Sequence, residues 1–518
     1  MCYNIRMFSL GILKNLLPND ARARRGSLIY VAASLLLLAG LIVLFSAWQV
    51  LAMAISLAFF VMAFYRPRWI VMFLAVWIPF EPFFLKFVPD EIYVYARYFS
   101  EGLIYVLAAI IILRLIFGEK KIKPTPLDLP FVLFLLVLVA SVIINAVPGG
   151  IALLGIRQII RFVLFFFVVV YLYPPRDFIR RLTMVMFVMV LLQGIIGITQ
   201  AVVGTPLDEF LIPSERKFFE SIQLTSGITQ FWDPGSRVFA TMGRYDQLGT
   251  FLTFFLLFAL ALLYERNLRQ HHRELWLVLA IGIPTLILTF SRASWFGFLL
   301  GFLLIGIWLA RDQRVLMGFL IFLGMVFGYL AYSGIVVATL TEASGHQTVA
   351  ERFFEAFSYE RWRGEYFGLG RLYWIVQTPA VVVRAAPLFG VGPGQFGGGA
   401  ATALGNSRAY DALGLPFGVF GTEGYIDNNW FSLWGEAGTI GFGFYIWMYL
   451  ALFVTAVKVY AASTDPLTRG LSAGLAGAMV AITLQAFLGS YLEMRTLALY
   501  LWLFGAFVVV LGRREKII

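Results

Sequence analysis

The sequence predicts an all-α, polytopic integral membrane protein with about 14 transmembrane helices. Its 518 residues are 60% hydrophobic and 13% charged, and its mean hydropathy is +0.84. Soluble domains have about 45–50% apolar and about 25% charged residues. This composition excludes disordered chains, collagens, secreted disulfide scaffolds and ordinary soluble enzymes. The apolar runs are continuous rather than alternating, which also excludes a transmembrane β-barrel.

Fourteen segments are long and apolar enough to be candidate spans. A spanning helix needs about 20 apolar residues, and proline, glycine and charge mark the loops between helices. The candidates are 27–46, 48–65, 69–88, 101–118, 129–147, 152–173, 179–203, 245–264, 275–291, 293–310, 315–338, 429–457, 468–489 and 494–511. The weakest are the third, because Pro79 and Pro82 interrupt it, and the close pair that meets at Ser291-Arg292.

These spans divide the chain into six parts. They are a cytoplasmic or interfacial N-terminus (1–26), helices 1–7 (27–203), a long periplasmic loop (204–244), helices 8–11 (245–338), a second long periplasmic loop (339–428), and helices 12–14 with a short cytoplasmic tail (429–518). Both loops are rich in aromatic residues and glycine, so we expect them to be ordered and to cap a cavity. We expect residues 371–385 to form a helix on the membrane surface and 387–396 to form a glycine turn.

The distribution of positive charge gives the orientation. The chain has 40 Lys and Arg against 29 Asp and Glu, a net charge of +11. With both termini in the cytoplasm (N-in and C-in), 24 of the 40 basic residues fall on cytoplasmic segments, as the positive-inside rule requires. The other sixteen lie on the outer side or within spans. Charge is costly there and usually faces a cavity or a partner.

Metal sites and cofactors are not expected. Cys2 is the only cysteine, and the three histidines are His271, His272 and His346. They have no spacing typical of a zinc site.

Several outer-facing motifs follow one another along the chain. They are Arg157 and Arg161 one helical turn apart, the segment 237–249 with Arg237 and Arg244, the Ser291-Arg292 turn, Arg371 followed by Pro387-Leu-Phe-Gly-Val-Gly392, and Asp427-Asn428 followed by Gly435-Glu-Ala-Gly438. This succession, over about residues 150–450, resembles the O-antigen ligase and O-antigen polymerase superfamily of bacterial envelope-glycan assembly.

The resemblance implies a metal-independent glycosyltransferase in the bacterial inner membrane, with its active site facing the periplasm. Such an enzyme transfers a glycan from undecaprenyl diphosphate to a hydroxyl of a glycan or lipid acceptor. Its partners would be that donor, that acceptor, membrane lipids and other envelope-polysaccharide assembly proteins, but no nucleic acid. The ligases typically have histidine where this chain has Asp427. Because a carboxylate also serves as a general base, the difference favours a polymerase-type member over a lipid A core ligase, and it leaves open a member with altered or lost activity.

The chemistry of such a transfer explains the arginines. Guanidinium groups grip phosphate oxygens bidentately and stabilise the charge that develops on a leaving diphosphate. On the resemblance, Asp427, Arg292 and Arg371 are the expected catalytic residues, and Asp427 takes the acceptor proton. The expected substrate-binding residues are Arg157, Arg161, Arg237, Arg244 and Asn428.

Structural explanations compete with these roles. Arg157 and Arg161 would also be explained by snorkelling, Arg292 by a helix-turn anchor, and Asp427 by helix capping. Glu436 is expected to hydrogen-bond a neighbouring helix rather than to do chemistry, and Glu81 is an unassigned intramembrane carboxylate and a candidate site residue. A transporter of lipid-linked glycans or of small solutes such as inorganic carbon is the alternative function, and a structural partner of an assembly complex is a third. A transporter should have paired charges near the bilayer midplane and broken helices.

Overall fold

The structure is a computed structural model that describes residues 44–118, 123–213, 218–219, 222–223, 237–265, 272–340, 347–418 and 423–518. The expected N-terminal segment 1–26 lies outside the described residues, as does nearly all of the expected first span, 27–46.

The described chain is essentially all helical, which confirms the predicted fold class. In the first half, the helices are α3 (Ala47–Tyr65), α4 (Pro67–Trp77), α5 (Glu81–Leu85), α6 (Asp90–Ile116), α7 (Asp128–Ile144), α8 (Gly149–Leu172), α9 (Arg176–Val203), α10 (Thr205–Leu211), η1 (Ala240–Met242) and α12 (Tyr245–Tyr264). The second half contains α13 (His272–Leu288), α14 (Arg292–Leu303), η3 (Leu304–Leu309), α15 (Gln313–Ala338), α16 (Val349–Phe354), η4 (Glu355–Phe357), α17 (Tyr359–Phe367), α18 (Arg371–Gln377), η5 (Thr378–Val383), α19 (Gly399–Ala403), α20 (Arg408–Leu413), α21 (Asn429–Ala462), α22 (Pro466–Gln485) and α23 (Arg495–Arg514). A two-residue strand, β1 (Phe218–Phe219), pairs antiparallel with β2 (Ile222–Gln223).

Within the described residues, ten helices are long and apolar enough to cross a membrane. This is the pattern of a multi-pass membrane protein. Every expected span from the second onward coincides with a helix or helix pair, but not all of them reach spanning length. The third, 69–88, is split into α4 and the short α5 by a turn at Pro79, and α7 has only 17 residues. The count of 14 and the N-in, C-in orientation therefore remain predictions.

The chain divides into two compact units. The described part of the first comprises residues 44–61 together with Val88–Phe99, and in it the rings of Phe59 and Phe99 meet edge to face at 5.1 Å. The second comprises Met62–Phe87 and Ser100–Ile518, and it contains all the groups described below.

The core of the second unit is formed by α12, α22 and α23. Helix α23 is almost wholly buried, and Tyr500 and Phe504 pack against the phenylalanines of α12. Helix α22 presents Gly470 and Gly474 to α12, where an added Cβ would lie 2.4 Å from Leu262 and 2.8 Å from Phe258. Small residues let apolar helices approach closely inside a membrane.

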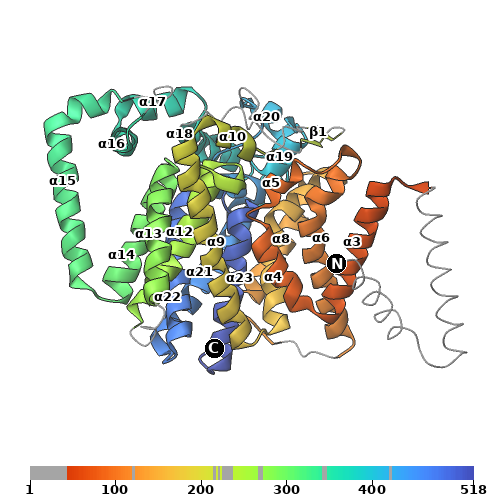
Figure 1. Cartoon of the computed structure of the whole chain (residues 1–518). Helices are drawn as coiled ribbons and strands as arrows, with labels where there is room; N and C mark the ends of the chain where they lie inside the picture. Colours follow the sequence, from red (N-terminus) through yellow and green to blue (C-terminus); the bar gives the residue numbers. More distant parts are fainter. Residues whose placement is uncertain are drawn as a thin grey trace, which may run out of the picture. The chain divides into compact units, whose positions relative to one another are not determined.

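The helices α16, α17, α18 and α20 lie at one end of the second unit, and the C-terminus lies at the other end (Figure 1). The described part of the second long loop is ordered, as expected. Its own apolar core contains Trp374, Val382, Phe396, Tyr410, Leu415 and Ile426. The segment predicted as a surface helix is helical as α18 and η5, but Trp374 and Val382 are buried in this core. The predicted helix over 371–385 is therefore confirmed, and one of its faces packs against the loop itself, while its position on a membrane surface stays a prediction.

The predicted glycine turn is confirmed, and it packs against a break in α21. At Gly438 the backbone leaves the helix with φ of 68°. The groups that this break frees bond to the turn: Thr439 N donates to Pro387 O at 2.9 Å, and Val391 N donates to Gly435 O at 2.9 Å. Irregular backbone at membrane depth is stable only where protein partners satisfy it.

Gly438→Ala is expected to destabilise the protein by about 2–4 kcal/mol. A Cβ there would lie 2.3 Å from Gly390 N, and the positive φ is strained for any other residue. Thermal unfolding in detergent measures the effect. Gly443→Ala, in the same helix, is the control, because a Cβ at Gly443 meets nothing within 4 Å. Equal stability of the two variants would show that the break is not closely packed.

Candidate functional site

The centre of the candidate site is an ion pair between Arg371 and Asp427. Arg371 begins α18, and Asp427 lies just before α21. Arg371 Nη2 donates to Asp427 Oδ2 at 3.1 Å, and the two side chains are 27% and 30% exposed. Both groups are therefore partly accessible, unlike a buried structural pair.

Glu355 brings three further arginines to the same region. This carboxylate is completely buried at the start of η4. Arg292 Nη1 lies 3.1 Å from its Oε1, Arg352 Nη1 lies 3.0 Å from its Oε2, and Arg361 Nε lies 3.5 Å from its Oε1. The carboxylate thus fixes Arg292, at the Ser291-Arg292 turn, beside the helices of the second loop.

Glu365 joins this group to Arg371. Its Oε1 accepts from Arg361 Nη2 at 2.6 Å, and its Oε2 accepts from the backbone N–H of Arg371 at 2.9 Å. Burial alone would raise the pKa of Glu365, but Arg371 and Arg361 outweigh it and hold that pKa below its usual value. The carboxylate is therefore ionised at neutral pH and orients both arginines.

Arg244 approaches Asp427 from the start of α12. Its Nη2 donates to Asp246 Oδ2 at 2.9 Å, and it interacts electrostatically with Asp427 and Tyr425. Arg237 lies beside it, stacked over the ring of Tyr245 at 4.3 Å. Burial would lower the pKa of Arg244, but Asp246 outweighs it and raises that pKa above its ordinary value.

Burial and neighbouring carboxylates also have opposite effects on the pKa of Arg371. Burial would lower the pKa of its guanidinium, but Asp427 and Glu365 raise it above the ordinary value. Tyr491 also interacts with Arg371, Asp427 and Asp246, and burial raises the pKa of its phenol well above the usual value. The group made by Arg244, Arg292, Arg361, Arg371, Asp427, Glu355 and Glu365 is called the outer cluster below.

A second group of charges is buried among the spans. Glu101 of α6 accepts from Arg157 Nε at 2.5 Å and from Arg161 Nη1 at 3.1 Å. Arg495, at the start of α23, donates to Glu81 Oε2 at 2.9 Å and lies 3.8 Å from Glu101. Together these five residues are called the inner network. It gives a partner to Glu81, which the sequence left unassigned.

The segment between α22 and α23 touches both groups. Arg161 Nη2 donates to Glu493 O at 2.7 Å, and Gln158 and the N–H of Gly399 donate to the Glu493 carboxylate, each at 3.1 Å. Burial raises the pKa of this carboxyl, and these donors oppose the rise. Two residues earlier, Tyr491 interacts with the outer cluster.

The structure thus brings together Arg292, Arg371, Asp427 and Arg244, with Arg237 adjacent. Arg157 and Arg161 belong to the inner network, and Arg161 is only 5% exposed. Asn428 is fully buried and caps α21, because its Oδ1 accepts from Phe431 N at 3.1 Å. Asn428 rather than Asp427 is therefore the helix cap, and the Asp427 carboxylate is available to Arg371.

Sequence reasoning missed the carboxylates that organise these arginines: Glu101, Glu355, Glu365 and Glu493. Their signal was available, because an acidic side chain beside unassigned basic residues in apolar sequence implies pairing. Glu436, set aside as structural, accepts from Gly394 N at 2.9 Å and Phe396 N at 3.3 Å, and so orders the glycine turn. Among the described side chains, no three of the metal-binding types His, Cys, Asp and Glu gather into a cation site.

Compared with known proteins, the sequence matches no family model. It also matches no curated protein.

Proposed function

We propose that the chain is a metal-independent glycosyltransferase that joins glycans carried on undecaprenyl diphosphate, and that the outer cluster is its active site. The observation that supports this proposal most directly is the partly exposed Arg371–Asp427 ion pair, which lies beside Arg244 and Arg292. A carboxylate beside always-charged guanidinium groups supports this proposal, because transfer from a lipid diphosphate requires a general base next to phosphate ligands.

In the proposed reaction, Asp427 takes the proton of the acceptor hydroxyl as its oxygen attacks C1 of the donor sugar. The bond between C1 and the diphosphate oxygen breaks, and its electron pair leaves with the diphosphate. Arg371 and Arg292 hold that diphosphate, and Arg244 adds positive charge beside it. Inversion at C1 follows from a single displacement.

The Arg371–Asp427 pair is then the resting state of the site. A donor diphosphate competes for the Arg371 guanidinium and so releases the Asp427 carboxylate to act as base. The Nε of Arg371 is buried and has no hydrogen-bond partner in the described part of the chain. An unmet buried donor is costly, so a phosphate oxygen that reaches it would be bound favourably.

The motif resemblance supports three further parts of the proposal. They are the location of the protein in the inner membrane, the position of the site at the periplasmic face, and a polymerase-type reaction with a glycan acceptor rather than lipid A core.

The test is complementation of cells that lack the gene with wild type, Arg292→Ala, Arg371→Ala or Asp427→Asn. We expect wild type to restore long glycan chains on a gel and each variant to leave them short, at equal membrane abundance. A longer carrier-linked chain identifies a polymerase, and capped lipid A core identifies a ligase. Glycans of unchanged length in all three variants would contradict the assignment of Arg292, Arg371 and Asp427 as catalytic residues.

A transporter is the second candidate, and the inner network favours it. Glu101, Arg157 and Arg161 are paired charges within spanning helices, and α21 is broken at Gly438. These are features of transporter sites. The discriminating observation is chemical: a transporter moves its substrate unchanged, whereas the proposed enzyme releases undecaprenyl diphosphate.

A further inference from the structure

A cavity of about 460 Å³ lies among α4, α6, α8 and α9 of the second unit, away from the outer cluster. Eleven residues line it, and those that matter here are Tyr65, Arg66, Arg68, Trp69, Arg114 and Arg181. Four of the eleven are arginines and none is acidic. The volume falls within the range of about 300–1,000 Å³ that is usual for ligand pockets.

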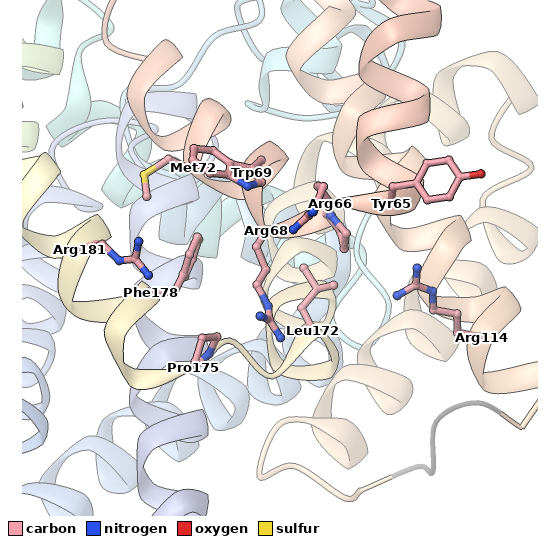
Figure 2. Close-up of a pocket in the computed structure, with 11 residues that line it drawn as sticks. Tyr65, Arg66, Arg68, Trp69, Met72, Arg114, Leu172, Pro175, Phe178 and Arg181 are labelled. Atoms are coloured by element: carbon pink, nitrogen blue, oxygen red, sulfur yellow. The ribbon is translucent and has the colours of Figure 1, made fainter. Parts of the chain in front are cut away.

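The four arginines come from separate parts of the chain. Arg66 joins α3 to α4, Arg68 is in α4, Arg114 is in the last turn of α6, and Arg181 is in the second turn of α9. Figure 2 shows Arg68 between Arg181 on one side and Arg114 on the other. The positive-inside rule explains why arginines lie on one face, but not why four of them line one cavity.

The cavity lies at the opposite end of α9 from the outer cluster. The far end of α9 adjoins the approach to Arg244, because Gln200 Oε1 accepts from Phe239 N and Ala240 N. Arg181 and Gln200 are separated by about 29 Å of helix at 1.5 Å per residue, which is close to the thickness of a bilayer core. The cavity and the candidate active site therefore lie at opposite ends of α9, separated by about the thickness of a bilayer core.

The cavity walls combine this charge with aromatic groups suited to a membrane interface. Trp69 and Tyr65 are 61% and 74% exposed beside the arginines. Tryptophan and tyrosine favour the headgroup level of a bilayer, so these exposed rings are suited to contact a lipid whose headgroup is held by the arginines. A free anion would use the arginines but not these rings.

We propose that this cavity binds the headgroup of an anionic phospholipid. Arg66, Arg68 and Arg181 hold the phosphate, Arg114 adds positive charge, and the acyl chains run along Trp69 and Tyr65. Basic pockets between transmembrane helices bind anionic headgroups in this way, and guanidinium groups suit phosphate because they bind it bidentately. Bound anion also relieves the repulsion among four like charges. This inference does not depend on the proposed function.

The test is native mass spectrometry of the purified full-length protein in detergent, titrated with phosphatidylglycerol. We expect phosphatidylglycerol to bind at least about tenfold more tightly than phosphatidylcholine. Replacement of Arg66, Arg68 and Arg181 together by glutamine should weaken the binding of phosphatidylglycerol at least about tenfold. The control replaces three exposed arginines outside the cavity lining, as Arg180→Gln, Arg273→Gln and Arg314→Gln together. We expect this triple variant to change the affinity for phosphatidylglycerol less than about twofold.

A second triple variant tests the proposal even if the glutamine triple variant folds poorly. Arg66→Lys, Arg68→Lys and Arg181→Lys together keep the charge but lose the bidentate geometry, and we expect about threefold weaker binding. Three results would overturn the proposal: equal losses in the glutamine and control triples, full affinity in the lysine triple, or equal binding of the two lipids. Displacement of the lipid by millimolar inorganic phosphate would identify a soluble-anion site instead and would also overturn it.

Discussion

Glu101→Ala is expected to lower the free energy of unfolding by about 3–5 kcal/mol, or to prevent accumulation of folded protein. Glu101 is 5% exposed and is the shared acceptor of Arg157 and Arg161. Its removal leaves both guanidinium groups among the spans without that counter-charge. Breaking a buried pair costs far more than the pair's net contribution, because a charge remains without compensation. Thermal unfolding and protease resistance in detergent measure the loss.

The matched control is Glu360→Ala. Glu360 also pairs with an arginine, Arg363 at 3.6 Å, but that pair is at the surface, with side chains 40% and 56% exposed. Exposed pairs contribute about 0–1 kcal/mol, so this variant should unfold almost as wild type does. If Glu101→Ala is no less stable than Glu360→Ala, the inner network is not a set of mutually dependent charges.

Arg371→Lys is expected to reduce glycan transfer about 10²-fold while the protein remains folded. Lysine keeps the positive charge beside Asp427. It loses the planar fork that contacts Asp427 and Glu365 together and that would grip a diphosphate. The initial rate of donor consumption in proteoliposomes measures the effect.

Arg363→Lys is the control for this substitution. Arg363 lies in α17, in the same loop, but it pairs with Glu360 outside the outer cluster. Its conservative replacement should leave the rate within about twofold of wild type. Equal rates in Arg371→Lys and wild type would show that geometry at Arg371 does not matter, and the proposed role of this residue would be wrong.

The sequence predicted the helical fold well, because hydropathy reports directly on helices that must satisfy their own backbone in lipid. It located helices for every described candidate span, including the break at Pro79. It also predicted the glycine turn at 387–396. It did not predict the partner of that turn, because the break at Gly438 lies within an apolar run that reads as one helix.

The sequence predicted the arginines of the candidate site but not the ion pairs that they form. Arginines in an apolar chain stand out, so Arg292, Arg371 and Arg244 were found. The pairing of each arginine with a carboxylate was not predicted, since pairing depends on the tertiary fold: Asp427, itself a predicted residue, is 56 residues from Arg371, and the missed Glu101 is 60 residues from Arg161. The helix cap was considered at Asp427, and the structure shows that Asn428 takes it instead.

The outer cluster is proposed to transfer a glycan from a lipid diphosphate to an acceptor hydroxyl. The most direct measurement incubates the purified protein in proteoliposomes with an undecaprenyl diphosphate-linked glycan and a metal chelator, and follows both products. We predict that undecaprenyl diphosphate is released in step with longer glycan, and that Asp427→Asn reduces both at least about 10²-fold. Donor that crosses the bilayer intact, with no diphosphate released, would contradict the claim and identify a transporter.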